Sequence, residues 1–409
     1  MKKPELLAPA GNFEKAKIAF LYGADAIYCG TADLSLRSRT EVNMDELVKI
    51  IEYTHNLNKK IYVAMNIYAR DEDYEEIKRQ AQILNSLRVD GIIISDGGVV
   101  DAVKQYAPDV DIHISTQANI VSSHSCEFWY KNGAKRVILA RELNKEEIRH
   151  ITECKPNGLE TEIFVHGAIC FGYSGRCFLS NFLAGRSSNL GDCAQSCRWQ
   201  YNVYVEENKK TGALMPVEDD ERGTFIFSSK DLCLIREIPE IIEMGIESLK
   251  IEGRLKTEYY LATVINIYRH AIDDYMSNTD KYDAEKYLKE LDKTKTRGLT
   301  TLYFNDKNNK DIQDYTGQQS NNFYEFGGKV VGFDNEKTII EIRNKLSVGD
   351  EMEIILPNAV QGYKFIIQQL YDIETNEEIP TINPGVQGQK VKMILPVEVK
   401  EGYIIRRKK

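Results

Sequence analysis

The sequence predicts an α/β protein whose main domain is a (β/α)8 barrel, followed by a small antiparallel β-barrel domain. Across residues 4–166, seven short Val/Ile-rich runs each precede an amphipathic segment, as expected of parallel strands buried on both faces. An eighth run, SLKIEG at 248–253, precedes a long helical segment and would close the barrel. Beyond residue 322, short strand-like runs are broken by Gly, Asn and Asp.

The elements of the first domain follow one another regularly. The first seven predicted strands are ELLAP (5–9), AIYC (26–29), KIYVAMN (60–66), GIIIS (91–95), DIHIS (111–115), RVILA (136–140) and EIFVHG (162–167). The predicted helices are 13–22, 44–56, 74–87, 98–106, 122–132 and 145–152, with 257–276 after the eighth strand. An open doubly wound sheet is the alternative, but no GxGxxG fingerprint follows the first strand.

The chain divides into two domains and a linker. Residues 1–304 are expected to form the barrel, interrupted after strand seven by a cysteine-rich insertion at about 168–245. Residues 305–322 are polar and are interpreted as a linker. Residues 323–409 would form the small β-barrel, which could bind RNA or another protein or simply stabilise the chain.

Polar residues collect at the carboxyl ends of the predicted strands, where barrel enzymes place their active sites. They are Asn12, Asn66, Asp96, Thr116, Gln117, Arg141, Glu142, His166, Glu252 and Arg254. The insertion leaves from the same rim. The sequence therefore predicts a site at the barrel mouth, beneath the cysteine-rich segment.

The insertion contains closely spaced cysteines. Cys170, Cys177, Cys193 and Cys197 are separated by six, fifteen and three residues, and Cys233 follows. The amino terminus MKKPELLAPAG has no apolar segment of a secretory signal, which disfavours disulfides and indicates a cytoplasmic protein. A metal or cluster site is the favoured interpretation.

Two kinds of metal site fit these cysteines differently. Structural zinc usually takes pairs of tight Cys-x2–4-Cys knuckles, and only Cys193 and Cys197 are that close. A 4Fe-4S cluster accepts four scattered cysteines and is the favoured cofactor. Zinc is the alternative, and buried or redox-active thiols are a third interpretation. Five candidates for four positions leave one of Cys193, Cys197 and Cys233 as a spectator.

Composition places limits on function. The 409 residues are 42% hydrophobic and 28% charged, as in an ordinary globular protein. No apolar run approaches the roughly 18 residues of a transmembrane helix, so no membrane partner is expected. The net charge of −9 is unusual for a nucleic-acid-binding protein. A basic stretch remains at 406–409 and could contact phosphates.

Several segments carry a family resemblance. HGAICFGYSGRCFLS, NLGDCAQSCRW, SSKDLCLI and SLKIEGRLK, together with the amino-terminal ELLAPAGNFEKAKIAFLYGADAIYCG, resemble the collagenase-like peptidase family, family 32 of the peptidases of unassigned catalytic type. The resemblance covers essentially the whole chain. The length and the C-terminal β-domain favour the branch of that family that modifies tRNA.

The resemblance implies a function. Members of that branch hydroxylate the wobble uridine of tRNA at its 5-position, using a prephenate-derived pathway and an iron–sulfur cluster. The implied cluster ligands are Cys170, Cys177, Cys193 and Cys233, with Cys197 less surely a ligand. The implied partners are tRNA and a small prephenate-like dicarboxylate. A paralogous protein partner or a homo-oligomer is compatible with the sequence.

A dicarboxylate would need cations at the mouth, since guanidinium groups bind carboxylates bidentately. The candidate substrate-binding residues are Arg37, Arg39, Gln117, Arg141 and Arg254. Structural ion pairs with Glu142 or Glu252 are the alternative role of these arginines. The candidate catalytic residues, as proton-transfer groups, are Glu142, His166 and Glu252.

Two other functions remain alternatives. A collagenase-like peptidase is the first, although no HExxH or GxSxG motif is present and only His166 and Cys170 suggest a nucleophile pair. A zinc-stabilised RNA-binding scaffold is the second. Iron and sulfide analysis separates the hydroxylase from both.

Overall fold

A computed structural model describes most of the chain. The described residues are 1–31, 34–35, 42–169, 177, 179–186, 188, 192–199, 203–205, 215–217, 229–294, 296, 298–309, 311–312, 323–385 and 388–409. Among the sequence-predicted site residues, Arg37, Arg39 and Cys170 lie outside this set.

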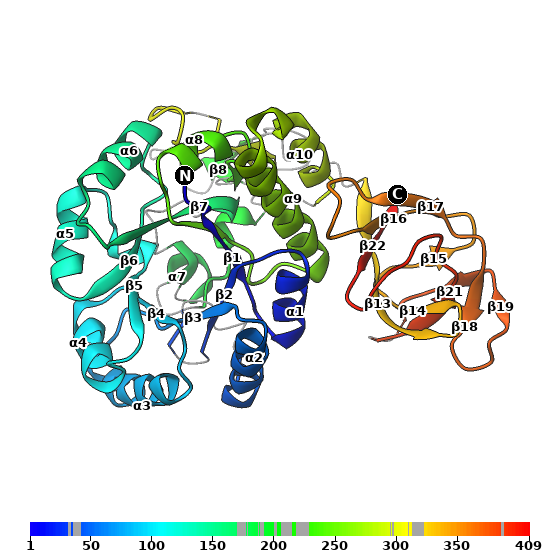
Figure 1. Ribbon diagram of the computed structural model, residues 1–409, viewed down its shortest axis with the longest axis horizontal. Helices are drawn as coiled ribbons and strands as arrows, with labels where there is room; N and C mark the ends of the chain where they lie inside the picture. Colours follow the sequence, from blue (N-terminus) through cyan, green and yellow to red (C-terminus); the bar gives the residue numbers. More distant parts are fainter. Residues whose placement is uncertain are drawn as a thin grey trace.

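The first domain is a closed barrel of eight parallel strands (Figure 1). Its strands are β1 (Glu5–Pro9), β2 (Ala26–Gly30), β3 (Lys60–Ala64), β4 (Gly91–Ile94), β5 (Asp111–Ile114), β6 (Ala134–Ile138), β7 (Glu160–Ala168) and β11 (Ser248–Ile251). Each strand pairs in parallel with the next, and β11 pairs with both β7 and β1. The predicted fold class and the predicted eighth strand are confirmed, and the doubly wound alternative is excluded.

Helices cover the outside of the barrel. They are α1 (Phe13–Leu21), α2 (Met44–Asn56), α3 (Tyr74–Ser86), α4 (Gly97–Tyr106), α5 (Ser123–Lys131), α6 (Lys145–Cys154), α8 (Ile238–Glu243) and α9 (Glu258–Ser277), followed by α10 (Ala284–Leu291). Many begin at a residue whose side chain caps the first turn. Asn144 and Glu147, for example, form a capping box at the start of α6. The short α8, which the sequence analysis did not predict, occupies the helix position between β7 and β11.

Part of the insertion is tied to the barrel. The short strand β10 (Asp231–Cys233) pairs antiparallel with the end of β7, opposite His166 to Ala168, and also pairs with β12 (Leu299–Thr300). The insertion also contains α7 (Leu179–Ala184) and the hairpin of β8 (Val203–Val205) and β9 (Met215–Val217). Cys233 is thereby placed directly beside the carboxyl end of β7.

The second unit is an antiparallel curled sheet at the side of the barrel (Figure 1). Its main strands, in spatial order, are β17 (Tyr363–Ile366), β16 (Glu351–Ile355), β22 (Ile404–Lys408), β13 (Tyr324–Asp334), β14 (Lys337–Ile342), β21 (Lys390–Met393), β18 (Leu370–Asp372) and β19 (Glu378–Ile379). A small pair is formed by β15 (Leu346–Ser347) and β20 (Thr381–Ile382). The predicted antiparallel β-domain is confirmed.

The two units share an apolar and polar interface. Ile355, Val360 and Ile404 belong to the same buried cluster as the barrel core. The hydroxyl of Tyr22 on α1 donates to the carbonyl of Ile355 and accepts from the amide of Ile404, each at 2.9 Å. These contacts hold the β-domain against α1 and α9.

The basic stretch at 406–409 does not lie free at the surface. It ends β22, a central strand between β13 and β16. Arg406 is buried and pairs with Glu353 and with Glu290, 2.5 Å away. Arg407 and Lys409 pair with Glu325, and Lys408 pairs with Glu351. The prediction that this stretch contacts phosphates is therefore wrong for Arg406, because burial removes its guanidinium from any external ligand.

Among the described residues, no helix is both long enough and apolar enough to cross a membrane.

Candidate active site at the barrel mouth

A lysine lies in the barrel interior below the mouth. Lys250 on β11 is 3% exposed, and its Nζ lies 4.4 Å from the ring centroid of Tyr28 and 5.4 Å from that of Phe164. Oε1 of Glu162 accepts a hydrogen bond from this Nζ at 2.8 Å. Burial lowers the pKa of Lys250, while the Glu162 carboxylate opposes that shift.

Arg141 also lies over the ring of Phe164. Its guanidinium carbon is 4.0 Å from the Phe164 ring centroid, and its Nη1 donates to the carbonyl of Ala168 at 2.9 Å. Its Nε is buried and makes no hydrogen bond within the described part of the chain. A buried cationic donor without a partner is expected to face a ligand, because an unmade hydrogen bond is costly.

Arg254 occupies the opposite side of Tyr28. It is 5% exposed, its guanidinium carbon lies 5.8 Å from the Tyr28 ring, and its Nη1 donates to Oγ of Ser35 at 2.7 Å. Gly30 makes this position available, because a Cβ on Gly30 would lie 2.5 Å from Nη1 of Arg254. Arg141, Lys250 and Arg254 thus form a cationic group around two aromatic rings.

Acidic side chains border this group. Glu252, directly after β11, is 9% exposed, and its Oε2 lies 3.5 Å from the Tyr28 hydroxyl. That hydroxyl also donates to the carbonyl of Ile251. Glu142 follows Arg141 and is half-buried. The predicted residues Arg141, Glu252 and Arg254 are therefore brought to one rim.

The other side of the mouth carries neutral amides. Asn66 follows β3, and Gln117 lies in a short 3-10 turn after β5. Asn66 Nδ2 donates to Oε1 of Gln117 at 2.6 Å. Gln117, a predicted substrate-binding residue, is thus held by a side chain from the end of β3, across β4.

His166, a predicted proton-transfer residue, is buried against α9. A register shift at Lys250/Ile251 accompanies the end of β7, and His166 contacts Tyr268 and Tyr260 of α9. Its Nδ1 lies 3.3 Å from the Tyr268 hydroxyl. Burial lowers the pKa of His166 to about 4, so the ring is neutral at neutral pH.

One cysteine donor, Cys233, lies beside this end of β7. Cys233 is buried, its Sγ lies 3.8 Å from the Tyr268 hydroxyl, and burial raises the pKa of its thiol to about 12. Cys177, Cys193 and Cys197 are half-buried. The Sγ of Cys193 accepts a hydrogen bond from the amide of Gln195 at 3.4 Å, a contact typical of thiolate ligands.

Folding of the insertion brings two of these donors onto adjoining segments. Ser188 Oγ donates to the carbonyl of Cys177 at 2.5 Å, and the amide of Ala194 donates to Oγ of Ser180 at 2.8 Å. Among the described residues, no group of three or more Cys, His, Asp or Glu is arranged to hold a metal ion. Cys170, which would complete the predicted ligand set, lies outside those residues. The sulfur donors themselves suit a cluster.

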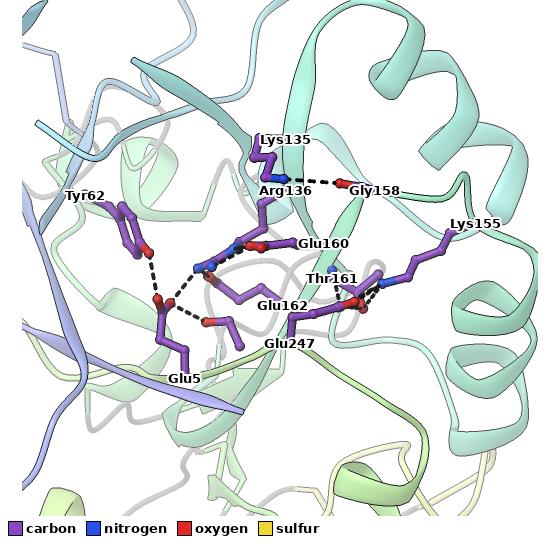
Figure 2. A network of polar contacts seen from close by, with 11 residues as sticks. Glu5, Tyr62, Lys135, Arg136, Lys155, Gly158, Glu160, Thr161, Glu162 and Glu247 are labelled. Atoms are coloured by element: carbon purple, nitrogen blue, oxygen red, sulfur yellow. Dashed lines mark hydrogen bonds and ion pairs between the residues drawn. The ribbon is translucent and has the colours of Figure 1, made fainter. Parts of the chain in front are cut away.

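An ion-pair network closes the barrel below the mouth (Figure 2). Arg136 Nη1 lies 2.6 Å from Glu5 and 3.1 Å from Glu162, and its Nη2 lies 2.7 Å from Glu160. The Tyr62 hydroxyl donates to the second oxygen of Glu5 at 2.7 Å. Because Glu162 contacts both Arg136 and Lys250, the network supports the cation beneath the mouth.

Sequence reasoning missed several of these residues. Lys250, Tyr28 and Phe164 lie within strands rather than after them. Ser35 lies in the loop after β2. The detectable signal was a lysine inside the otherwise apolar run SLKIEG, because a buried strand tolerates a lysine only with partners.

Comparison with known proteins agrees with this architecture. The family described as Peptidase family U32 matches residues 11–314, and the Peptidase family U32 C-terminal domain matches residues 322–406. The chain belongs to peptidase family U32. The predicted family resemblance is confirmed.

Curated relatives of this U32 protein carry two kinds of name. It is 39% identical to tRNA hydroxylation protein P1 of Bacillus subtilis, over 92% of this chain and 89% of that protein. It is 35% identical to tRNA hydroxylation protein P of Escherichia coli, over 99% and 96%. It is also 31% identical to a protein of Porphyromonas gingivalis named collagenase, over 97% and 95%.

Proposed function

We propose that this U32 protein hydroxylates the wobble uridine of tRNA at C5, using an iron–sulfur cluster and a prephenate-like dicarboxylate. Two relatives named for tRNA hydroxylation align with nearly the whole chain, which supports RNA hydroxylation. The observation that carries the proposal is the cationic group of Arg141, Lys250 and Arg254 at the mouth, beneath a cysteine-rich insertion.

The arginines would bind the dicarboxylate. Arg141 has an unpartnered buried Nε, and Arg254 has Nη1 fixed by Ser35, so both guanidinium groups are positioned before a ligand arrives. Lys250 lies below them and is held in place by its ion pair with Glu162. Such preorganised charge favours an anionic ligand over water.

The cluster would be held by Cys170, Cys177, Cys193 and Cys233, with Cys197 as the alternative ligand. A bound cluster would supply electron transfer or an open iron site for the oxidation. The high pKa of the Cys233 thiol means that metal binding must displace its proton. Zinc at the same cysteines is the alternative cofactor.

The carboxylates of Glu252 and Glu142 would transfer protons at the mouth. Glu252 lies within 3.5 Å of the Tyr28 hydroxyl, beside the cationic group. Glu142 follows Arg141 after β6, which is separated from β11 by β7. His166 is buried against Tyr268, so its role is to pack the end of β7 rather than to exchange protons with a substrate.

The tRNA base must enter the mouth unstacked, because enzymes that modify a base remove it from its stack. Trp199, at the end of the described insertion segment, is 44% exposed and is available for stacking on RNA. A tRNA substrate places the proposed reaction in the cytoplasm.

The test is complementation of a bacterial host deleted for its own U32 hydroxylases. Transfer RNA would be digested to nucleosides and 5-hydroxyuridine derivatives measured by mass spectrometry. Wild type and the surface control Arg236→Ala should restore the nucleosides, whereas Arg254→Ala should not. No restoration by well-folded, cluster-loaded wild type would overturn the proposal, and cleavage of gelatin by the same protein would favour peptidase activity.

A further inference from the structure

The barrel mouth has two chemically different sides. The cationic group lies on or just after β6 and β11, whereas Asn66, Ser115 and Gln117 lie at the ends of β3 and β5. The cationic side suits carboxylates. The side chains of Asn66, Ser115 and Gln117 are neutral and suit the edge of a neutral heterocycle.

Hydrogen bonds determine which way the Gln117 amide faces. Oγ of Ser115 accepts from the amide N–H of Gln117 and from Nδ2 of Asn66, each at 3.4 Å. The Ser115 hydroxyl proton is then available to donate, and it does so to Oε1 of Gln117 at 2.9 Å. Asn66 Nδ2 donates to the same oxygen at 2.6 Å. In this arrangement the Gln117 oxygen accepts from both Asn66 and Ser115.

The nitrogen of this amide is therefore directed away from the Asn66–Ser115 pair. Within the described part of the chain, Nε2 of Gln117 donates no hydrogen bond. Gln117 as a whole is 8% exposed, and its Nε2 is not among the fully buried atoms that lack a partner. A largely buried side chain therefore keeps an accessible N–H donor at the mouth, where a ligand acceptor would pair with it.

The frame around Gln117 is rigid. Ser95 Oγ donates to the carbonyl of Asn66 at 3.3 Å, and Thr116 Oγ1 donates to the carbonyl of Leu139 at 3.3 Å. Asn119 ends the turn in a left-handed conformation with φ of 57°. The donor is thus held in place by β4 and β6 as well as by β3.

We propose that Nε2 of Gln117 donates to the O4 carbonyl of the target base and makes the enzyme select uridine over cytidine. This inference rests on the proposed function. Uracil presents an acceptor at that position, whereas cytosine presents an amino donor, which would face the Gln117 donor without a hydrogen bond. Discrimination of this kind is strong because the wrong base leaves buried polar groups unpaired.

The Gln117→Glu variant tests this assignment with little change in shape. It keeps an oxygen for Asn66 and Ser115 and replaces the Nε2 donor by an acceptor, which fits the cytosine amino group. Gln117→Ala removes the donor altogether. Gln368→Glu, at an exposed glutamine of the β-domain, is the matched control.

The measurement is the ratio of hydroxylated uridine to hydroxylated cytidine. The deleted host would express one tRNA in two versions, with uridine or cytidine at the wobble position. The inference predicts that the ratio falls at least tenfold in Gln117→Glu and Gln117→Ala, and stays at the wild-type value in Gln368→Glu. A ratio is insensitive to loss of folded protein, so a merely structural role of Gln117 would not change it.

The outcomes distinguish failure of the Gln117 assignment from failure of the proposed function. Hydroxylated tRNA from wild type with an unchanged ratio in both Gln117 variants would overturn the inference and leave the proposed function standing. No product from wild type would overturn the proposed function itself. If the variants react too slowly, the dissociation constants of purified protein can be measured for two anticodon stem-loops, one with uridine and one with cytidine at the wobble position. A Gln117 variant that changes both dissociation constants by the same factor would refute the assignment.

Discussion

Nζ of Lys250 lies 2.8 Å from Oε1 of Glu162 in the barrel interior, directly below the candidate site. Burial raises the pKa of the Glu162 carboxyl, but Lys250 and Arg136 outweigh burial and hold that pKa below its usual range. Lys250 is thus joined through Glu162 to the ion-pair network of Arg136 at the base of the barrel. The Lys250–Glu162 pair therefore links the base of the barrel to the side chains beneath the mouth.

Replacing Lys250 by methionine should destabilise the protein. The change leaves Glu162 with one cation fewer in the interior, and breaking a buried pair costs about 3–5 kcal/mol. The double variant Lys250→Met, Glu162→Gln should recover part of that loss. Urea unfolding measures both, with Lys49→Met at an exposed lysine of α2 as control. A change below about 0.5 kcal/mol in the single variant, as at ordinary surface sites, would contradict the pairing.

Tyr22→Phe should loosen the contact between the two units. The Tyr22 hydroxyl donates to the Ile355 carbonyl and accepts from the Ile404 amide, so its removal leaves two buried backbone groups without this hydrogen bond. We expect a loss of about 1–3 kcal/mol in the free energy of unfolding. Tyr363→Phe, at a residue that is 40% exposed, should be neutral. Equal effects of the two changes would argue against this interface.

Acidification should weaken the ion pairs around Arg406. Burial raises the pKa of the Glu353 carboxyl, but Arg406 and Lys293 outweigh burial and hold it below its usual range. A carboxyl with a lowered folded pKa stabilises the protein above its unfolded pKa, about 4.3 for glutamate, and that stabilisation is lost as pH falls through the folded pKa. The difference in stability between wild type and Glu353→Gln should therefore shrink below about pH 4.3. A difference that stays constant to lower pH would contradict this role.

Gly30→Ala should impair the site through Arg254. An added Cβ would lie 2.5 Å from Nη1 of Arg254, so the guanidinium must leave its bond to Ser35. Hydroxylation in the complementation assay should fall at least tenfold relative to the amount of folded protein, the order expected for displaced binding groups. Gly97→Ala is the matched control, because a Cβ there meets no atom within 4 Å. Full activity of Gly30→Ala would remove Arg254 from the site.

Single cysteine variants should identify the cluster ligands. On protein purified without oxygen, the proposed function predicts about four irons and four sulfides per chain. Both should be lost in the alanine variants of Cys170, Cys177, Cys193 and Cys233, retained in one spectator variant, and retained in Cys126→Ala, a buried cysteine of α5. Stoichiometric zinc without sulfide would instead indicate a structural knuckle.

Much of the fold could be predicted from the sequence because its signals are local. A few residues are enough to recognise a buried parallel strand such as GIII at 91–94, or the capped start of the helix at 44–56. The short α8 was missed because six residues carry little periodicity. The basic stretch at 406–409 was misread because only pairing with β13 and β16 makes β22 a central strand.

The site was predictable only in outline. Polar residues after the strands, such as Gln117 and Arg254, follow from the barrel rule. The orientation of His166 toward α9 depends on a register shift between β7 and β11, and the role of Lys250 depends on Glu162 across that same strand pair. The spacing of residues within either strand does not predict such contacts between strands.

The most direct test of the account is to locate the added oxygen on tRNA. Transfer RNA from the deleted host carrying wild-type or Arg254→Ala protein would be cut into defined oligonucleotides and sequenced by mass spectrometry. In cells with wild-type protein, we expect one added oxygen on the wobble uridine or on a nucleoside derived from it. In cells with Arg254→Ala, we expect none. An unmodified wobble uridine in cells containing folded, cluster-loaded wild-type protein would contradict the account.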